Sequence, residues 1–93
     1  MMRVELEYRL ATQPEARRLR ESAGALAALS QLSDRELEVA RLVAQGLKSD
    51  DIGQRLHIST RTVIAHLEHI YGRLQIRSRA VLTRIVTQAD LAR

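Results

Sequence analysis

The stretch from residue 59 to residue 74, STRTVIAHLEHIYGRL, constrains the fold most, because it carries a single apolar seam at helical spacing. Apolar side chains recur there with the 3.6-residue period of an α-helix that packs on a core. They are Val63, Leu67, Ile70 and Leu74. Ser59 is a favoured N-cap residue, so the helix is predicted to begin at Thr60.

The opposite face of this helix is predicted to point away from the core. It carries Arg61, Ile64, Ala65, Glu68 and Gly72. An apolar pair at the head of a helix, here Ile64 and Ala65, indicates either a contact surface or an incidental feature. Because single exposed apolar residues are common in soluble proteins, the pair alone does not establish a contact.

Length and composition restrict the chain to one small domain. It has 93 residues, of which 45% are hydrophobic, and two independent cores do not fit in that length. Cysteine is absent, which excludes disulfides, a thiol nucleophile and a cysteine-based zinc site. No apolar run approaches the roughly 18 residues of a membrane span, and no secretion signal is recognisable. The sequence therefore predicts a soluble, cytoplasmic protein.

Positive charge is concentrated in the second half of the chain. The formal net charge is +4, but residues 55–84 contain six arginines and one acidic residue, Glu68. Such a concentration indicates a polyanionic partner. The alternative is an ordinary solvated surface in an arginine-rich composition.

The N-terminal segment has two readings. Residues 1–11 alternate apolar and charged side chains as a strand does, yet most of them are good helix formers, and we favour a helix. A strand would need a partner, most simply the same segment of a second copy. Thr12 and Glu15 form a capping-box pattern that predicts a helix to about Leu29. Its packing stripe is predicted to be Leu19, Ala23, Leu26, Ala27 and Leu29.

The next helix has the clearest start in the chain. Ser33 and Glu36 form a capping box, and a helix is predicted from there to about Gln45, ended by Gly46 in a left-handed conformation. Its buried residues are predicted to be Leu37, Val39, Ala40 and Val43.

Two further helices are predicted, one before and one after the stretch from residue 59 to residue 74. One is predicted from Ser49 or Asp50 to Leu56, with Gly53 allowing a close approach of the helix that follows. The last is predicted from an N-cap at Ser78 to about Leu91 and carries two apolar stripes. They are Leu82, Val86 and Ala89, and beside them Val81, Ile85 and Gln88. Because a core needs only one stripe, the second indicates an intermolecular contact.

Two short helices joined by a tight turn form the pattern of a helix-turn-helix, which places its second helix in the DNA major groove. With the flanking helices, residues 32–91 resemble the C-terminal DNA-binding domain of LuxR-type (GerE-like) bacterial transcription regulators. The residues that carry the resemblance are Leu32, Ser33, Arg35, Glu36, Glu38, Val39, Gly46, Leu47, Ile52, Arg55, Leu56, Ile58, Ser59, Arg61, Thr62, Val63, His66, Leu67, Ile70, Leu74, Arg77, Ser78 and Arg79.

The resemblance implies an all-α fold. A four-helix LuxR/GerE-like helix-turn-helix domain would occupy residues 32–93, and an N-terminal helical extension or linker would occupy residues 1–31. It also implies a transcription regulator that binds the major groove of double-stranded DNA as a homodimer, without a cofactor. Family members usually carry a further domain before this one, so we expect either a stand-alone regulator or a fragment of a longer one.

The resemblance assigns three sets of contacts. The base-contacting residues would be Arg61, Ile64, Ala65 and Glu68. The phosphate-contacting residues would be Lys48, Thr60, Thr62, Arg73, Arg77 and Arg79. The last helix would form the dimer interface through Val81, Ile85 and Gln88.

This sequence departs from the usual family pattern on the recognition face. Ile64 stands where lysine is usual, and Glu68 stands where a polar or basic residue is frequent. Ile64 and Ala65 can offer apolar contact to thymine methyls, and Glu68 can accept a hydrogen bond from a cytosine amino group. Without such a donor, phosphates would repel the carboxylate.

Three departures concern the backbone. Lys48 replaces a common Ser or Thr cap, so Ser49 is expected to cap the helix one residue late. His57 and Gln75 fall where glycine is common and are expected to adopt unusual backbone angles.

Other functions fit less well. His66 and His69 lie three residues apart, but no carboxylate or cysteine completes a metal site, and no catalytic constellation is recognisable. We therefore expect neither an enzyme nor a metal protein. The main alternative is a protein-interaction module that binds RNA polymerase or a sensor domain through Ile64 and Ala65. The helix-turn-helix of sigma-factor region 4 is a related DNA-binding alternative.

Overall fold

The computed structural model describes residues 14–91, and within that range the chain is helical and has no strand. Its elements are α2 (Pro14–Leu29), α3 (Asp34–Ala44), α4 (Ser49–Leu56), α5 (Thr60–Leu74) and α6 (Arg79–Leu91). The predicted all-α class is therefore confirmed. The expectations for residues 1–11 and for Thr12 as an N-cap lie outside the described residues.

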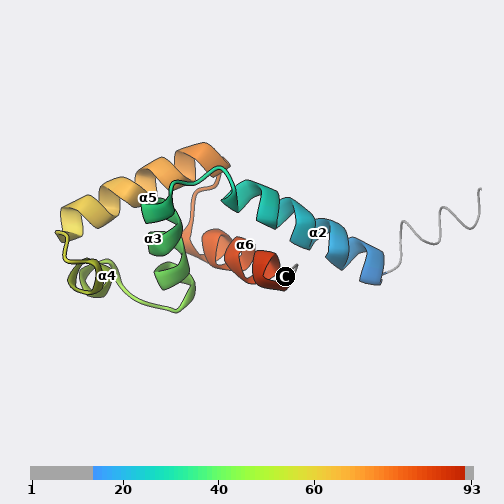
Figure 1. Ribbon diagram of the computed structural model, residues 1–93, viewed down its shortest axis with the longest axis horizontal. Coiled ribbons are helices and arrows are strands. Elements are labelled where there is room, and N and C mark those ends of the chain that lie inside the picture. Colours follow the sequence, from blue (N-terminus) through green and yellow to red (C-terminus); the bar gives the residue numbers. More distant parts are fainter. Residues whose placement is uncertain (1–13, 92–93) are drawn as a thin grey trace, which may run out of the picture.

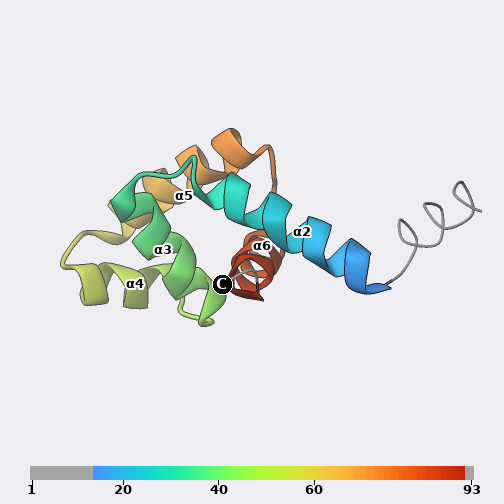
Figure 2. The ribbon, with the colours of Figure 1, turned by 45° about the vertical axis from the view of Figure 1, so that its right-hand side comes forward.

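Helix α3 lies at the centre of the domain and packs against α4, α5 and α6. Figures 1 and 2 show α2 running beside α6 at one end of the molecule, while α4 and the start of α5 form the other end. Helix α4 and the start of α5 therefore lie away from α2, whereas the end of α5 lies beside the turn that follows α2 (Figure 1).

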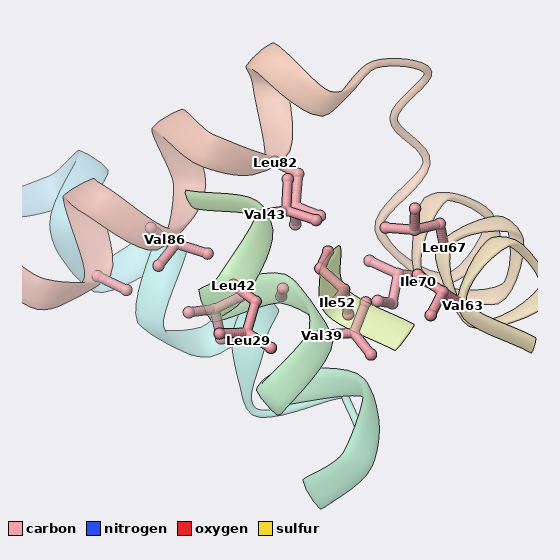
Figure 3. Close-up of a cluster of buried hydrophobic side chains, with 13 residues drawn as sticks. Leu29, Val39, Leu42, Val43, Ile52, Val63, Leu67, Ile70, Leu82 and Val86 are labelled. Atoms are coloured by element: carbon pink, nitrogen blue, oxygen red, sulfur yellow. The ribbon is translucent and has the colours of Figure 1, made fainter. Parts of the chain in front are cut away.

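The core is built from all five described helices. Figure 3 shows Ile52 of α4 next to Val39 of α3 and Ile70 of α5, and all three side chains are fully buried. The other buried hydrophobic residues are Ala25, Leu29, Ala40, Leu42, Val43, Val63, Leu67, Leu82, Val86 and Ala89. Since one side of α5 contributes to this core, its opposite side faces solvent.

The start of α3 follows the sequence prediction. The amide of Glu36 donates to Ser33 Oγ at 3.1 Å, and Glu36 Oε1 accepts from the amide of Ser33 at 2.9 Å, which confirms the capping box. Val39, Ala40 and Val43 are buried as predicted, whereas Leu37 is only half-buried, and the burial of Leu42 was not predicted. Helix α3 turns Glu36, Val39 and its neighbours inward, so Leu37 lies at the edge of that face.

The predicted packing face of α2 is correct at Leu29 and wrong at three other positions. Ala23, Leu26 and Ala27 are exposed, and the helix buries the line formed by Ser22, Ala25 and Leu29 against α6. Alanines on several sides of α2 make its apolar periodicity ambiguous, so the sequence alone does not show which line packs against α6. The side chain of Leu19 lies outside the described ones.

The turns between helices use left-handed backbone angles as predicted. Gly46 has φ 90°, while His57 and Gln75 have φ 59° and 55°. The expected late cap at Ser49 is wrong, because Lys48 occupies the N-cap position of α4 with no side-chain cap hydrogen bond. Lys48 has extended backbone angles and so lies just before the helix, which begins at Ser49.

Candidate nucleic-acid interface

The turn between α4 and α5 brings the backbone of Ile58 very close to Gly53. A β-carbon on Gly53 would lie 2.7 Å from the carbonyl oxygen of Ile58, so only glycine fits there without a shift of backbone. The amide of Ile58 donates to the Gly53 carbonyl at 2.9 Å. His57 between them ends α4 in the left-handed region. This contact fixes the angle between the two helices of the helix-turn-helix.

Hydroxyl groups organise the first turn of α5. Ser59 Oγ accepts from the amide of Thr62 at 3.1 Å, and a second hydrogen bond of 2.9 Å joins Ser59 Oγ to Thr62 Oγ1. Thr60 Oγ1 donates to Asp50 Oδ1 of α4 at 2.8 Å. Thr60 and Thr62 are both predicted phosphate contacts. Within the domain, Thr60 joins α5 to α4, and Thr62 takes part in the N-terminal cap of α5. The N-cap predicted at Ser59 is confirmed.

The outward side of α5 presents a stripe of four exposed residues, which we call the recognition stripe. It consists of Arg61, Ile64, Ala65 and Glu68. Among the described residues, Ile64 is one of the few large hydrophobic residues that are well exposed, at 46%. The opposite side of α5 is buried at Val63, Leu67 and Ile70. The structure thus brings together all four predicted base-contacting residues on one accessible surface.

Lys48 and Arg77, two of the predicted phosphate contacts, are exposed. Neither side chain forms a hydrogen bond or ion pair with any other residue between 14 and 91. Lys48 stands at the start of α4, and Arg77 lies in the segment that joins α5 to α6. Both cations can therefore approach a polyanion without breaking an internal contact.

Arg79, another predicted phosphate contact, is held within the domain. Its Nη1 donates to the carbonyl of Leu47 at 3.1 Å, and its Nη2 donates to Ser49 Oγ at 2.6 Å. These bonds join the start of α6 to the loop before α4 and to the first residue of α4. Arg79 consequently supports the position of the first helix of the helix-turn-helix, a role that sequence spacing did not reveal.

Arg73 is also engaged internally. Its Nη1 lies 3.1 Å from Glu36 Oε1 and donates to the carbonyl of Gln31 at 3.0 Å. Hydrogen bonding by the Ser33 amide holds the pKa of Glu36 below its usual value, and the charges of Arg73 and His69 act in the same direction against the effect of burial. The burial of Glu36 was not predicted from the sequence, because glutamate is seldom buried in proteins unless it is paired.

The predicted dimer stripe on α6 is half-buried. Val81, Ile85 and Gln88 are neither in the core nor fully exposed, and Ile85 packs against the core residues. Helix α2 lies against α6 (Figure 2). The inner stripe of Leu82, Val86 and Ala89 is buried as predicted.

Over residues 14–91 there is no group of three His, Cys, Asp or Glu side chains arranged to hold a metal ion. Among the described helices, none is both long and apolar enough to cross a membrane.

The helix-turn-helix corner, the central α3 and the C-terminal α6 reproduce the expected architecture of a known family. Residues 30–86 match the family model described as bacterial regulatory proteins, luxR family. The chain belongs to the luxR family of bacterial regulatory proteins. Its α4 and α5 are thus the helix-turn-helix of a family of DNA-binding transcription regulators.

Several curated proteins match the same region. The chain is 45% identical over 51 residues to the predicted HTH-type transcriptional regulator YhjB of Escherichia coli, which covers 55% of this chain and 26% of that protein. It is 38% identical over 60 residues to the oxygen regulatory protein NreC of Staphylococcus haemolyticus, covering 64% of this chain and 28% of NreC. A predicted HTH-type transcriptional regulator of Mycobacterium bovis is 47% identical over 51 residues, covering 55% of this chain and 6% of that protein.

This luxR-family chain spans between 6% and 28% of the length of these relatives. The shared part is the helix-turn-helix domain, and the relatives are named as regulators rather than as enzymes. A binding role in transcription regulation follows for the shared domain.

Proposed function

We propose that this luxR-family chain binds double-stranded DNA sequence-specifically and regulates transcription in the cytoplasm, with α5 in the major groove. The observation that carries the proposal is the recognition stripe, which is exposed on a helix whose opposite side is buried. The close contact at Gly53 holds α5 at a fixed angle to α4, so the stripe is presented as a rigid surface.

Phosphate contacts supply the affinity in this proposal. The side chains of Lys48 and Arg77 are exposed and have no internal partner among residues 14–91, and Thr60 and Thr62 lie at the first turn of α5. Each cation that neutralises a phosphate releases counterions, so the affinity falls as salt concentration rises. Arg73 and Arg79 were expected in the same role but donate to groups within the domain.

Base contacts supply the sequence preference. Arg61 can donate to guanine, Ile64 and Ala65 can contact thymine methyl groups, and Glu68 can accept from the amino group of cytosine. The four exposed side chains lie along one side of α5, as a helix in the major groove requires.

A binding assay with matched arginine variants tests this function. Fluorescence anisotropy with genomic fragments at low salt should show binding that weakens as salt is added. Arg61→Ala should weaken binding to the preferred fragment by about 1–3 kcal/mol. Arg35→Ala is the control, because Arg35 is exposed on α3 and pairs with Glu38 at 3.7 Å. Absence of binding by the unaltered protein at low salt would overturn the proposal.

The dimer proposal assigns the interface to Val81, Ile85 and Gln88 on α6. Val81→Asp should shift the protein toward monomers in sedimentation equilibrium and weaken binding to a two-fold symmetric site more than to a half-site. Ala80→Asp introduces the same charge at a neighbouring exposed position and is the control. Equal behaviour of the two variants would place the interface elsewhere.

The alternative function is protein binding through the same stripe. It is favoured by one observation, the exposure of Ile64 beside Ala65, because an apolar surface suits a protein partner such as RNA polymerase or a sensor domain. If the protein fails to bind DNA at low salt but Ile64→Asp abolishes binding to purified polymerase, this alternative replaces the DNA proposal.

A further inference from the structure

The C-terminal end of α5 is attached to the turn between α2 and α3 by one guanidinium group. Arg73 Nη1 lies 3.1 Å from Glu36 Oε1 and 3.0 Å from the carbonyl oxygen of Gln31. Gln31 follows the end of α2, and Glu36 lies in the first turn of α3. One side chain of the recognition helix therefore contacts two successive parts of the chain that precede it.

The acceptor side of this contact is rigid. Glu36 is only 4% exposed, and its carboxylate is fixed by the amide of Ser33 at 2.9 Å. Because the carboxylate is shielded from water, its attraction to a cation is stronger than that of an exposed ion pair. Removing the cation would leave a buried charge without its partner, which is costly. Arg73 is thus held at a defined place although half of its side chain is exposed.

The geometry of α5 makes this contact important for DNA recognition. The helix has 15 residues and is fixed at its N-terminal end by the Gly53 corner. It extends roughly 20 Å, so a small displacement of its far end tilts the whole recognition stripe. The contact of Arg73 restrains that far end.

We propose that Arg73 is a positioning residue, which orients the recognition helix through Glu36 and Gln31 and keeps these contacts when DNA is bound, rather than a phosphate contact. The proposal rests on the proposed DNA-binding function. It also means that the turn after α2 is connected to the recognition stripe through the end of α5, which lies beside that turn (Figure 1).

A double-mutant cycle that compares the unaltered protein with three variants tests the connection. The variants are Arg73→Gln, Glu36→Gln and the combination of both. Glutamine at position 36 can still accept from the Ser33 amide, because both Glu and Gln serve in a capping box, so α3 keeps its start while the charge is lost. Arg77→Gln is the matched control, since Arg77 is an exposed arginine whose side chain has no internal partner among residues 14–91.

The affinity for the preferred DNA fragment is measured by anisotropy over a range of salt concentrations. Each single variant at positions 73 and 36 should weaken binding about three- to tenfold, and the double variant should be no weaker than either. The slope of the logarithm of affinity against the logarithm of salt should stay unchanged for Arg73→Gln. For Arg77→Gln the magnitude of that negative slope should decrease by about 0.9, because a phosphate contact is lost.

The opposite pattern overturns the proposal. Arg73 contacts a phosphate if Arg73→Gln reduces the magnitude of the salt slope as Arg77→Gln does. The same conclusion follows if the loss of affinity caused by Arg73→Gln adds to the loss caused by Glu36→Gln. An unchanged affinity of Arg73→Gln also contradicts a positioning role. If Arg73→Gln fails to fold, Glu36→Gln alone must show the loss of affinity at an unchanged slope. Failure of the proposed function looks different, because the unaltered protein would then not bind DNA at all.

Discussion

Gly53 of α4 and Ile58 in the turn before α5 form a close backbone contact at the corner of the helix-turn-helix. A β-carbon at position 53 would lie 2.7 Å from the Ile58 carbonyl oxygen, and the Ile58 amide donates to the Gly53 carbonyl at 2.9 Å. Steric contact thus limits how closely these two residues can approach each other, and a hydrogen bond joins them. The orientation of the recognition stripe depends on both.

Gly53→Ala should therefore destabilise the domain and disturb DNA binding. Its methyl group meets a backbone atom that cannot rotate away, so α5 must shift, at a cost of about 1–3 kcal/mol typical of overpacking. Urea unfolding measures the stability, and anisotropy measures the affinity. Gly24→Ala is the control, because a methyl group at position 24 would meet nothing within 4 Å, and alanine in the interior of α2 should stabilise by roughly 0.5–1 kcal/mol. Equal effects would contradict the role of the close contact.

The left-handed residue that ends α4 predicts a stabilising substitution. His57 has φ 59°, an angle that costs an L-residue with a side chain about 1–2 kcal/mol relative to glycine's freedom there. His57→Gly should raise the urea midpoint, less the larger chain entropy of glycine in the unfolded state. Gly46→Ala, at φ 90°, should lower the midpoint although its surroundings are open. A lower midpoint for His57→Gly would indicate that the imidazole itself stabilises the turn.

The fold was largely predictable because its signals are local. The capping box at Ser33, the N-cap at Ser59 and the left-handed turns at Gly46 and His57 depend on a few neighbouring residues. The packing face of α2 was not predictable, since it depends on how closely a distant helix approaches. Its alanines satisfy several helical faces equally well, and contact with α6 decides among them.

The candidate interface divides in the same way. The recognition stripe follows from the period of one helix, so the exposure of Ile64 and Glu68 was predictable. The internal contacts of Arg73 and Arg79 join residues 42 and 32 positions apart. No local pattern identifies such partners, and an arginine in a basic region is equally compatible with a phosphate contact or an internal one.

Glu36 predicts a specific dependence of stability on pH. Its pKa is lowered in the folded protein, chiefly by the hydrogen bond from the Ser33 amide, from the ordinary value of 4.5. The folded state therefore binds fewer protons than the unfolded state below that value. The stabilisation is present above about pH 4.5 and is lost as the pH falls through the lower folded pKa.

The difference in unfolding free energy between the unaltered protein and Glu36→Gln isolates this effect, because other carboxylates titrate in both proteins. The difference should be largest near neutral pH and should shrink as the pH falls below 4.5. Urea unfolding at several pH values measures it. A difference that stays constant down to about pH 3 would mean that the Glu36 carboxylate is not favoured by folding.

Glu68 predicts a loss of discrimination at one base pair. A carboxylate on the recognition stripe is repelled by phosphates and is compensated only where it accepts from a cytosine amino group. Glu68→Ala should therefore bind the preferred site about as well or more tightly and should bind sites with another base pair at that position markedly better. Each mismatch tolerated in this way corresponds to about 1–3 kcal/mol.

Anisotropy with a set of duplexes that vary one base pair at a time measures the discrimination. Ala65→Ser is the matched control, because it alters a neighbouring exposed residue of the stripe without removing a charge, and it should leave the preference for cytosine in place. A uniform gain in affinity over all duplexes would show that Glu68 only repels phosphate. Unchanged relative affinities for the duplexes would show that Glu68 does not contact the bases. The sequence preference would then depend on Arg61, Ile64 and Ala65.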